Sequence, residues 1–188
     1  MSSVFADFYR VDEARRVLWI IFPKHASNSL HNAIGELVTY PAKYGARLLN
    51  EKMFTVATIR HPYSRAVAAL KTVLWSEDRA FEDNLRFNLN NRHVRPIHGT
   101  LDGIRVDHWL RFEHLADDWA ALDAKRAVTE LEYSRPYRMI RYPERLPMIN
   151  VDPNAGKRPN WRNVSCDWKA FNKQFETEFS LNPEYDVR

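Results

Sequence analysis

The residues with the clearest potential for chemistry form a polar turn, Lys24 to Ser29, which directly follows an apolar run. The lysine supplies a positive charge, and the Ser and Asn side chains can donate hydrogen bonds. Small side chains at Ala26 and Ser27 would let the backbone approach a ligand closely. Because the N-terminus of a helix presents unpaired N–H groups to an anion, such a turn before a helix predicts a phosphate-binding cradle. It is not a Walker A loop, since no glycine lies between residues 23 and 30.

A second candidate for anion binding is Arg60, which follows another apolar run, residues 54–59. The forked guanidinium group of arginine matches the geometry of a phosphate. Arg65 lies five residues further on, inside a helix that we expect to begin at Pro62, and we expect it to be structural.

Two strand–turn–helix units in series are expected to position these residues. Residues 16–22 form a continuous apolar run typical of a strand buried on both faces, and residues 54–59 are rich in β-branched side chains. A helix is expected after each strand. Such units predict a parallel sheet covered by helices, in which ligands bind beyond the carboxyl ends of the strands. The helix after the first strand is predicted from the spacing of Leu30, Ile34, Leu37 and Val38.

The rest of the chain predicts one more strand and three more helices. The strand is expected at 106–112, and the helices at 78–89, 115–127 and 165–179. Residues 142–159 contain four prolines and predict a long loop. The last helix carries an aromatic stripe that we interpret as core: Trp168, Phe171, Phe175 and Phe179.

Taken in order, these motifs resemble those of the sulfotransferase superfamily, and its carbohydrate-modifying branch most closely. Residues 23–30 look like the family's 5′-phosphosulfate loop, and residues 60–69 look like its 3′-phosphate element. The resemblance covers nearly the whole chain. It extends to residues 93–96, 111–118, 146–150 and 179–186, which are similar to later family segments.

The resemblance implies a fold and an activity. The fold would be α/β, with a P-loop-like central parallel sheet flanked by helices in three layers (α/β/α), as a single sulfotransferase-like domain over residues 1–188. The activity would be transfer of a sulfuryl group from 3′-phosphoadenosine-5′-phosphosulfate (PAPS), which leaves PAP as the product. The acceptor would be a hydroxyl, expected on a sugar or glycan, or an amine, and no metal is required.

The resemblance also assigns roles in donor binding. Lys24 would contact the bridging oxygen of PAPS, where negative charge grows as the S–O bond breaks. The serine that the family uses for the 3′-phosphate is Ala68 in this chain, so one contact is missing. Lys157 and Arg158 are predicted to compensate for it. The full set of predicted donor-binding residues is Lys24, Ala26, Ser27, Asn28, Ser29, Arg60, Lys157 and Arg158.

A base is needed to accept the proton of the acceptor hydroxyl, and imidazole suits this task near neutral pH. His93 matches the histidine of the family's segment and is the predicted base, with His98 and His31 as alternatives. Glu113 would be a positioning residue by the resemblance, but its place at a strand end favours a structural role.

Composition narrows the other possibilities. The net charge of +4 is spread along the chain, so no basic arm for nucleic acid is expected, and Cys166 alone cannot form an internal disulfide. No apolar run can span a bilayer and no signal peptide is visible, so we expect a soluble, cytoplasmic protein. Two alternatives stay open: a nucleotide-dependent phosphotransferase, and a non-catalytic protein that keeps the PAPS fold. The identity of the acceptor molecule and the oligomeric state are not predicted.

Overall fold

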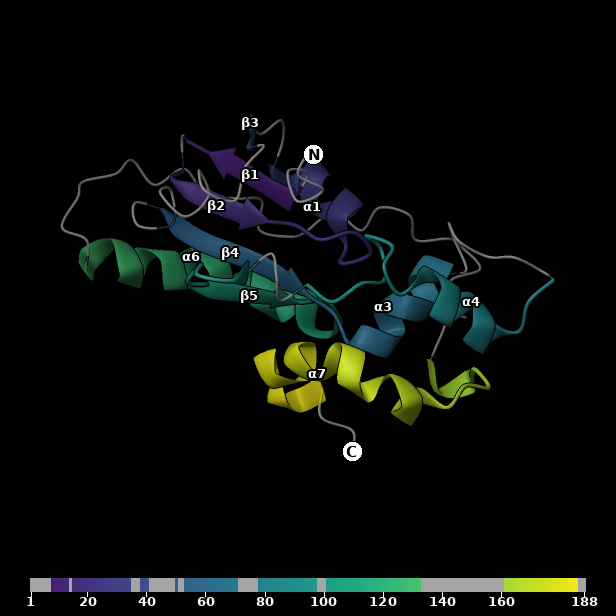
Figure 1. Ribbon diagram of the computed structural model, residues 1–188. Helices are drawn as coiled ribbons and strands as arrows, with labels where there is room; N and C mark the ends of the chain where they lie inside the picture. Colours follow the sequence, from purple (N-terminus) through teal and green to yellow (C-terminus); the bar gives the residue numbers. More distant parts are fainter. Residues whose placement is uncertain are drawn as a thin grey trace. The chain divides into compact units, whose positions relative to one another are not determined.

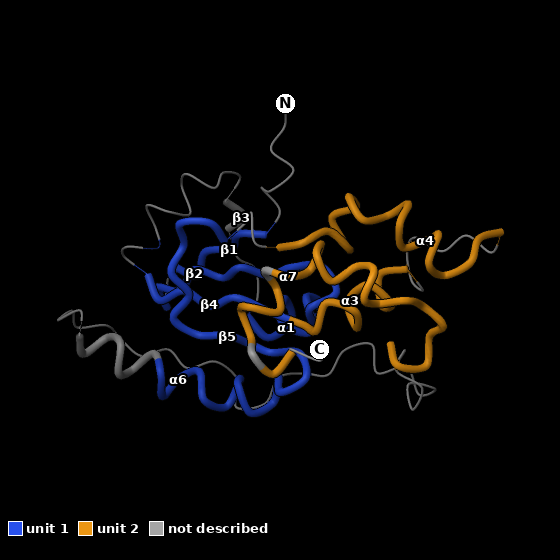
Figure 2. Tube along the Cα trace, turned by 60° about the horizontal axis from the view of Figure 1, so that its bottom comes forward, with its two compact units in different colours: residues 1–59, 100–149 blue, residues 60–99, 150–188 orange. Residues whose placement is uncertain are grey.

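The computed structural model describes residues 8–13, 15–34, 38–40, 50, 53–70, 78–97, 101–132 and 161–185. The chain divides into two compact units, each built from two separate stretches of sequence (Figure 2). Unit 1 comprises residues 1–59 and 100–149, and unit 2 comprises residues 60–99 and 150–188. Each unit is described by itself below. The single domain expected over residues 1–188 stays a prediction.

Unit 1 is built around a mixed sheet with strand order β3-β1-β2-β4-β5 (Figure 1). Strands β2, β4 and β5 are parallel, with Ile20 opposite Ala57 and Ile59 opposite Arg111. Strand β1 pairs antiparallel with both β2 and β3. The α/β class is therefore confirmed, but the sheet is mixed rather than parallel, because β1 runs antiparallel to the other four strands. The strands are β1 (Tyr9–Asp12), β2 (Val17–Ile20), β3 (Val38–Tyr40), β4 (Phe54–Ile59) and β5 (His108–Arg111).

Two helices of unit 1, α1 (Ser27–Ile34) and α6 (Leu115–Glu132), pack on one face of the sheet (Figure 1). Alternate residues of β2 (Val17 and Trp19) and of β4 (Phe54 and Val56) face them, as the two-residue period of a strand requires. The resulting core buries Trp19 against Trp119, whose rings stack with centroids 6.1 Å apart. The three-layer arrangement and the P-loop-like character of the sheet stay predictions. The buried cluster also contains Val17, Ile21, Leu30, Ala33, Ile34, Phe54, Val56, Leu110 and Leu122.

Unit 2 is helical where it is described, and its core is aromatic. The expected stripe is core, because Trp168, Phe171 and Phe175 are buried and the half-buried Phe179 packs against them. They pack with Tyr63 on α3, whose ring stacks on Trp168 with centroids 4.5 Å apart. The helices are α3 (Pro62–Ala69), α4 (Phe81–Asn88) and α7 (Asn172–Leu181), and the short 3-10 turns are η5 (Trp161–Asn163), η6 (Trp168–Phe171) and η7 (Pro183–Tyr185).

The sequence placed most elements but missed some boundaries. Strand β4 and the start of α3 at Pro62 lie where they were predicted. The helix expected from residue 165 begins as α7 only at Asn172, after the turn η6. Val38, expected on the first helix, lies instead in strand β3. Neither β1 nor β3 was predicted, because both are short and β1 contains charged residues.

Candidate functional site

The turn between β2 and α1 has an unusual backbone. Lys24 and Ala26 have φ angles of 66° and 62°, in the left-handed region, while His25 between them does not. For residues with a Cβ atom this conformation costs about 1–2 kcal/mol each. The backbone N–H of His25 donates to the carbonyl of Phe22 at 3.3 Å and so closes the turn. The turn leads directly into the N-terminus of α1, a position that favours an anion.

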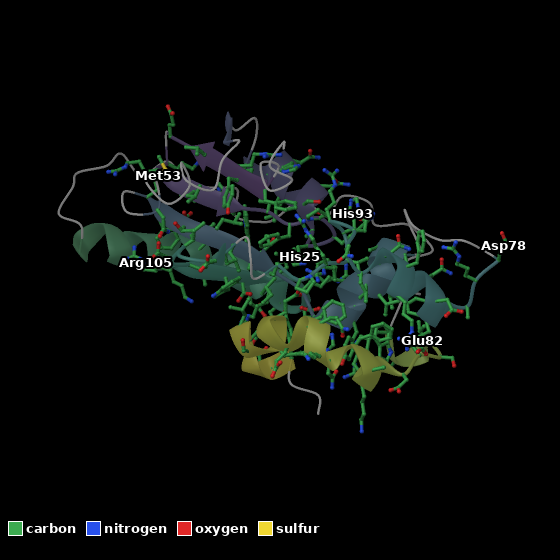
Figure 3. All side chains as sticks on the ribbon, viewed as in Figure 1. His25, Met53, Asp78, Glu82, His93 and Arg105 are labelled. Carbon is green, nitrogen blue, oxygen red and sulfur yellow. The ribbon has the colours of Figure 1, made fainter. Side chains whose placement is uncertain are left out.

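Thr58, near the end of β4, holds this turn in place. Its hydroxyl oxygen accepts a hydrogen bond from the Phe22 N–H (3.1 Å), and its carbonyl oxygen lies 3.1 Å from His25 Nδ1. Because a carbonyl can only accept, Nδ1 of His25 carries the proton. His25 is 1% exposed and packs on the ring of Phe22 (Figure 3). His25 is thus a structural link between the turn and β4, and we assign it no contact with a ligand.

The side chains of the turn differ in exposure. Lys24 and Ser27 are half-buried, and Asn28 is exposed. Ser29 is buried at the start of α1, where Leu30 N–H donates to the carbonyl of Ala26 (3.0 Å). The five predicted residues therefore lie close together in unit 1, Lys24 and Ala26 in the turn after β2 and Ser27, Asn28 and Ser29 in the first turn of α1.

Arg60 belongs to unit 2 and is buried. Its Nε donates to the hydroxyl of Ser64, one turn into α3, at 3.0 Å. The guanidinium group has four further N–H donors on its two terminal nitrogens. Ala68, which replaces the family's serine, is 9% exposed on the same helix. Ser64 thus fixes the direction of the Arg60 side chain.

His61 caps α3, although histidine is a poor helix cap by propensity. Its Nδ1 accepts from the backbone N–H of Tyr63 at 3.3 Å. Burial, followed by the charges of Arg162 and Arg60, lowers the pKa of His61 to about 4. The ring therefore stays neutral and keeps the lone pair that the cap needs. It stacks on Trp161 with centroids 5.0 Å apart.

His93, labelled in Figure 3, lies on the turn after α4. Its contacts with Asn91 hold the ring in one tautomer. Asn91 Oδ1 accepts the backbone N–H of His93 at 3.0 Å, which identifies that atom as the amide oxygen. The same oxygen lies 3.1 Å from His93 Nδ1. Because an oxygen acceptor needs a donor opposite it, Nδ1 carries the proton, and in the neutral ring Nε2 carries the lone pair. A neutral His93 in this state is a proton acceptor at Nε2.

The other predicted site residues divide into two groups. His98, Lys157 and Arg158 lie outside the described residues. His31 is exposed on α1, and Glu113 is exposed in the 3-10 turn η3 (Phe112–His114).

In the family-like segment 111–118, Arg111 is bonded directly to Asp118. Two side-chain hydrogen bonds (2.7 and 3.0 Å) and one backbone hydrogen bond connect them. Burial opposes ionisation of Asp118, but the bonds from Arg111 outweigh it and keep the pKa of Asp118 below its usual value.

Sequence reasoning overlooked residues that support the predicted ones. Asn91 sets the tautomer of His93. It could have been noticed in the sequence, because an Asn two residues before the histidine has the spacing of an Asx turn. Glu178 is fully buried on α7. Its burial could have been predicted from its spacing from Phe171 and Phe175, because this spacing places the carboxylate on the buried side of the helix.

Comparison with protein-family models, with curated proteins and with solved structures gave no match for this chain. Among the described residues, no group of three or more His, Cys, Asp or Glu side chains could hold a metal ion. None of the helices in the described part of the chain is long and apolar enough to cross a membrane.

Proposed function

We propose that this protein is a PAPS-dependent sulfotransferase, with a sugar or glycan hydroxyl as the favoured acceptor. The observation that carries the proposal is the segment from Lys24 to Ser29, where two left-handed residues lead into the N-terminus of α1 beside a lysine and hydroxyl side chains in a family-like order. Residues in sparsely populated backbone conformations cluster at ligand-binding and active sites, where the surrounding structure holds them in place.

The turn suits the 5′-phosphosulfate group of PAPS. The N-terminus of α1 favours a dianionic group over a neutral one. The side chains of Ser27, Asn28 and Ser29 supply further donors. The ammonium group of Lys24 would lie at the oxygen that bridges phosphorus and sulfur, where it stabilises the transition state more than the ground state.

The transfer step needs one base and releases one product. The acceptor oxygen forms a bond to sulfur while the bond from sulfur to the bridging oxygen breaks, and PAP leaves with the electron pair. His93 Nε2 takes the proton of the acceptor hydroxyl, since Asn91 already holds Nδ1 in its protonated state. Arg60 would bind the 3′-phosphate through its terminal nitrogens.

The proposal is tested first by ligand-dependent unfolding. PAP should raise the melting temperature by several degrees, while ATP with Mg²⁺ should raise it much less, because a ligand that binds only the folded state stabilises it. Equal shifts would favour a phosphotransferase. Incubation with radiolabelled PAPS and a panel of sugar acceptors should then move the label to a sugar. Binding of PAP without transfer to any acceptor would favour the non-catalytic alternative, to which Ala68 lends some support.

A further inference from the structure

A buried ion pair in unit 2 holds the segment that carries His93. Arg65 on α3 and Glu178 on α7 are 2% and 0% exposed, and Arg65 Nη2 lies 2.7 Å from Glu178 Oε1. The pair joins two helices that are more than one hundred residues apart in sequence. Its contacts extend to a third part of the chain, residues 94–97.

Each partner makes one hydrogen bond to the backbone of that third segment. Arg65 Nη2 donates to the carbonyl of Val94 at 2.7 Å, and Glu178 Oε1 accepts the N–H of Ile97 at 3.1 Å. Val94 and Ile97 are themselves buried. Hydrogen bonds with a charged partner are shorter, stronger and more directional than neutral ones. The segment is therefore fixed at two backbone atoms, three residues apart.

His93 lies between these bonds to residues 94–97 and a second set of bonds, which Asn91 makes. On its N-terminal side, Asn91 binds both the backbone N–H and the ring of His93, and the carbonyl of Asn91 accepts the N–H of Val94 at 2.8 Å. On its C-terminal side, Arg65 holds the carbonyl of Val94. The backbone of His93 is thereby constrained from both directions.

Stability alone is a poor explanation of this arrangement. A buried ion pair can often be replaced by apolar side chains of similar volume without loss of stability. This pair also leaves two buried atoms, Arg65 Nε and Glu178 Oε2, without a hydrogen-bond partner among the described residues.

We infer that Arg65 and Glu178 are positioning residues, which fix the backbone of residues 93–97 so that His93 Nε2 is held where it accepts the proton of the acceptor. This inference rests on the proposed function. A base that is misplaced by about 1 Å can lose about 100-fold in rate, so a rigid support for its backbone has a direct effect on turnover.

The main test uses the double variant Arg65→Met/Glu178→Leu, which removes both charges and keeps the volume nearly constant. The melting temperature and the affinity for PAP should stay close to wild type. Hydrogen exchange at the Ile97 amide should become at least about 10-fold faster, because its acceptor is lost. The kcat for sulfuryl transfer should fall about 10- to 100-fold with little change in KM for PAPS.

Two further variants sharpen the test. Glu178→Gln keeps an oxygen that can accept from Ile97, so its amide should stay protected and its kcat should exceed that of the double variant. The control is Glu82→Gln/Arg86→Met, which removes an exposed ion pair on α4 of the same unit. It should change neither the exchange rate of the Ile97 amide nor kcat.

The outcomes separate this inference from the proposed function. A stable double variant with wild-type kcat would overturn the inference, as would an Ile97 amide that stays protected without its partner. If the double variant does not fold, Glu178→Gln decides: a protected Ile97 amide together with a kcat as low as that of His93→Ala would overturn it. If wild type neither binds PAP nor transfers sulfate, the proposed function fails instead, and the Ile97 exchange still reports whether the pair anchors the segment.

Discussion

The hydrogen bond from His93 to Asn91 leads to a prediction about proton transfer. Replacing Asn91 with alanine removes the acceptor that keeps the proton on Nδ1. The neutral ring then no longer favours the tautomer that has its lone pair on Nε2. The backbone N–H of His93 loses the same hydrogen-bond partner. A hydrogen bond of this kind contributes about 0.5–1.5 kcal/mol, which corresponds to about a 2- to 12-fold loss of kcat.

Asn91→Asp should give a different result, because an aspartate keeps both hydrogen bonds but adds a negative charge. A carboxylate beside the ring favours the protonated imidazole, which cannot act as a base. We expect near-normal kcat at high pH and a loss of activity near pH 7, so that the acidic limb of the kcat profile moves upward by about one pH unit.

The assay is kcat for sulfuryl transfer between pH 5.5 and 9.5, with saturating PAPS and acceptor. The matched control is Asn90→Ala, which changes an exposed neighbouring asparagine and should behave as wild type. The reasoning would be refuted if Asn91→Ala matched wild type at every pH, or if Asn91→Asp left the acidic limb where it was.

Three further predictions concern the donor site and acid stability. Lys24→Ala should lower kcat about 100- to 1,000-fold while the fold is kept, and near-normal turnover would contradict its role. Ala68→Ser should tighten binding of PAP by about 1 kcal/mol or more in calorimetric titration, with no gain for adenosine 5′-phosphosulfate, which lacks the 3′-phosphate. Because the pKa of His61 falls from about 6.5 in the unfolded chain to about 4 in the folded protein, the unfolded state binds the extra proton first as pH falls. His61 should therefore account for about 2 kcal/mol of stability lost between pH 7 and pH 5. His61→Asn, which can still cap α3, should show less of this loss in urea unfolding, and an unchanged pH dependence would speak against it.

Local patterns predicted the parts of the structure that depend on local physics. The apolar run at 54–59 was long enough to identify β4, and Pro62 marked the start of α3 because its fixed φ suits the first helical position. The turn after β2 was recognised from its side chains. Its left-handed residues could not be foreseen, since neither Lys24 nor Ala26 favours positive φ by type.

Features that depend on distant residues were not predictable in the same way. Val38 continued a helical pattern, but pairing with β1 drew it into β3, because strand pairing depends on a partner elsewhere in the chain. Arg65 was expected to be structural, and its contacts with Val94 and Glu178 become visible only when three separate segments are seen together. Asn91 is the exception, since its spacing from His93 was readable from the sequence.

The central claim is that the backbone of residues 24–29 binds the phosphosulfate group, and amide chemical shifts report on it most directly. In a titration of the labelled protein with PAP, the amides of Lys24 to Ser29 should show the largest changes, while those of Phe81 to Asn88 on α4 should stay nearly constant. Binding of PAP that leaves the amides of the turn unchanged would contradict the account.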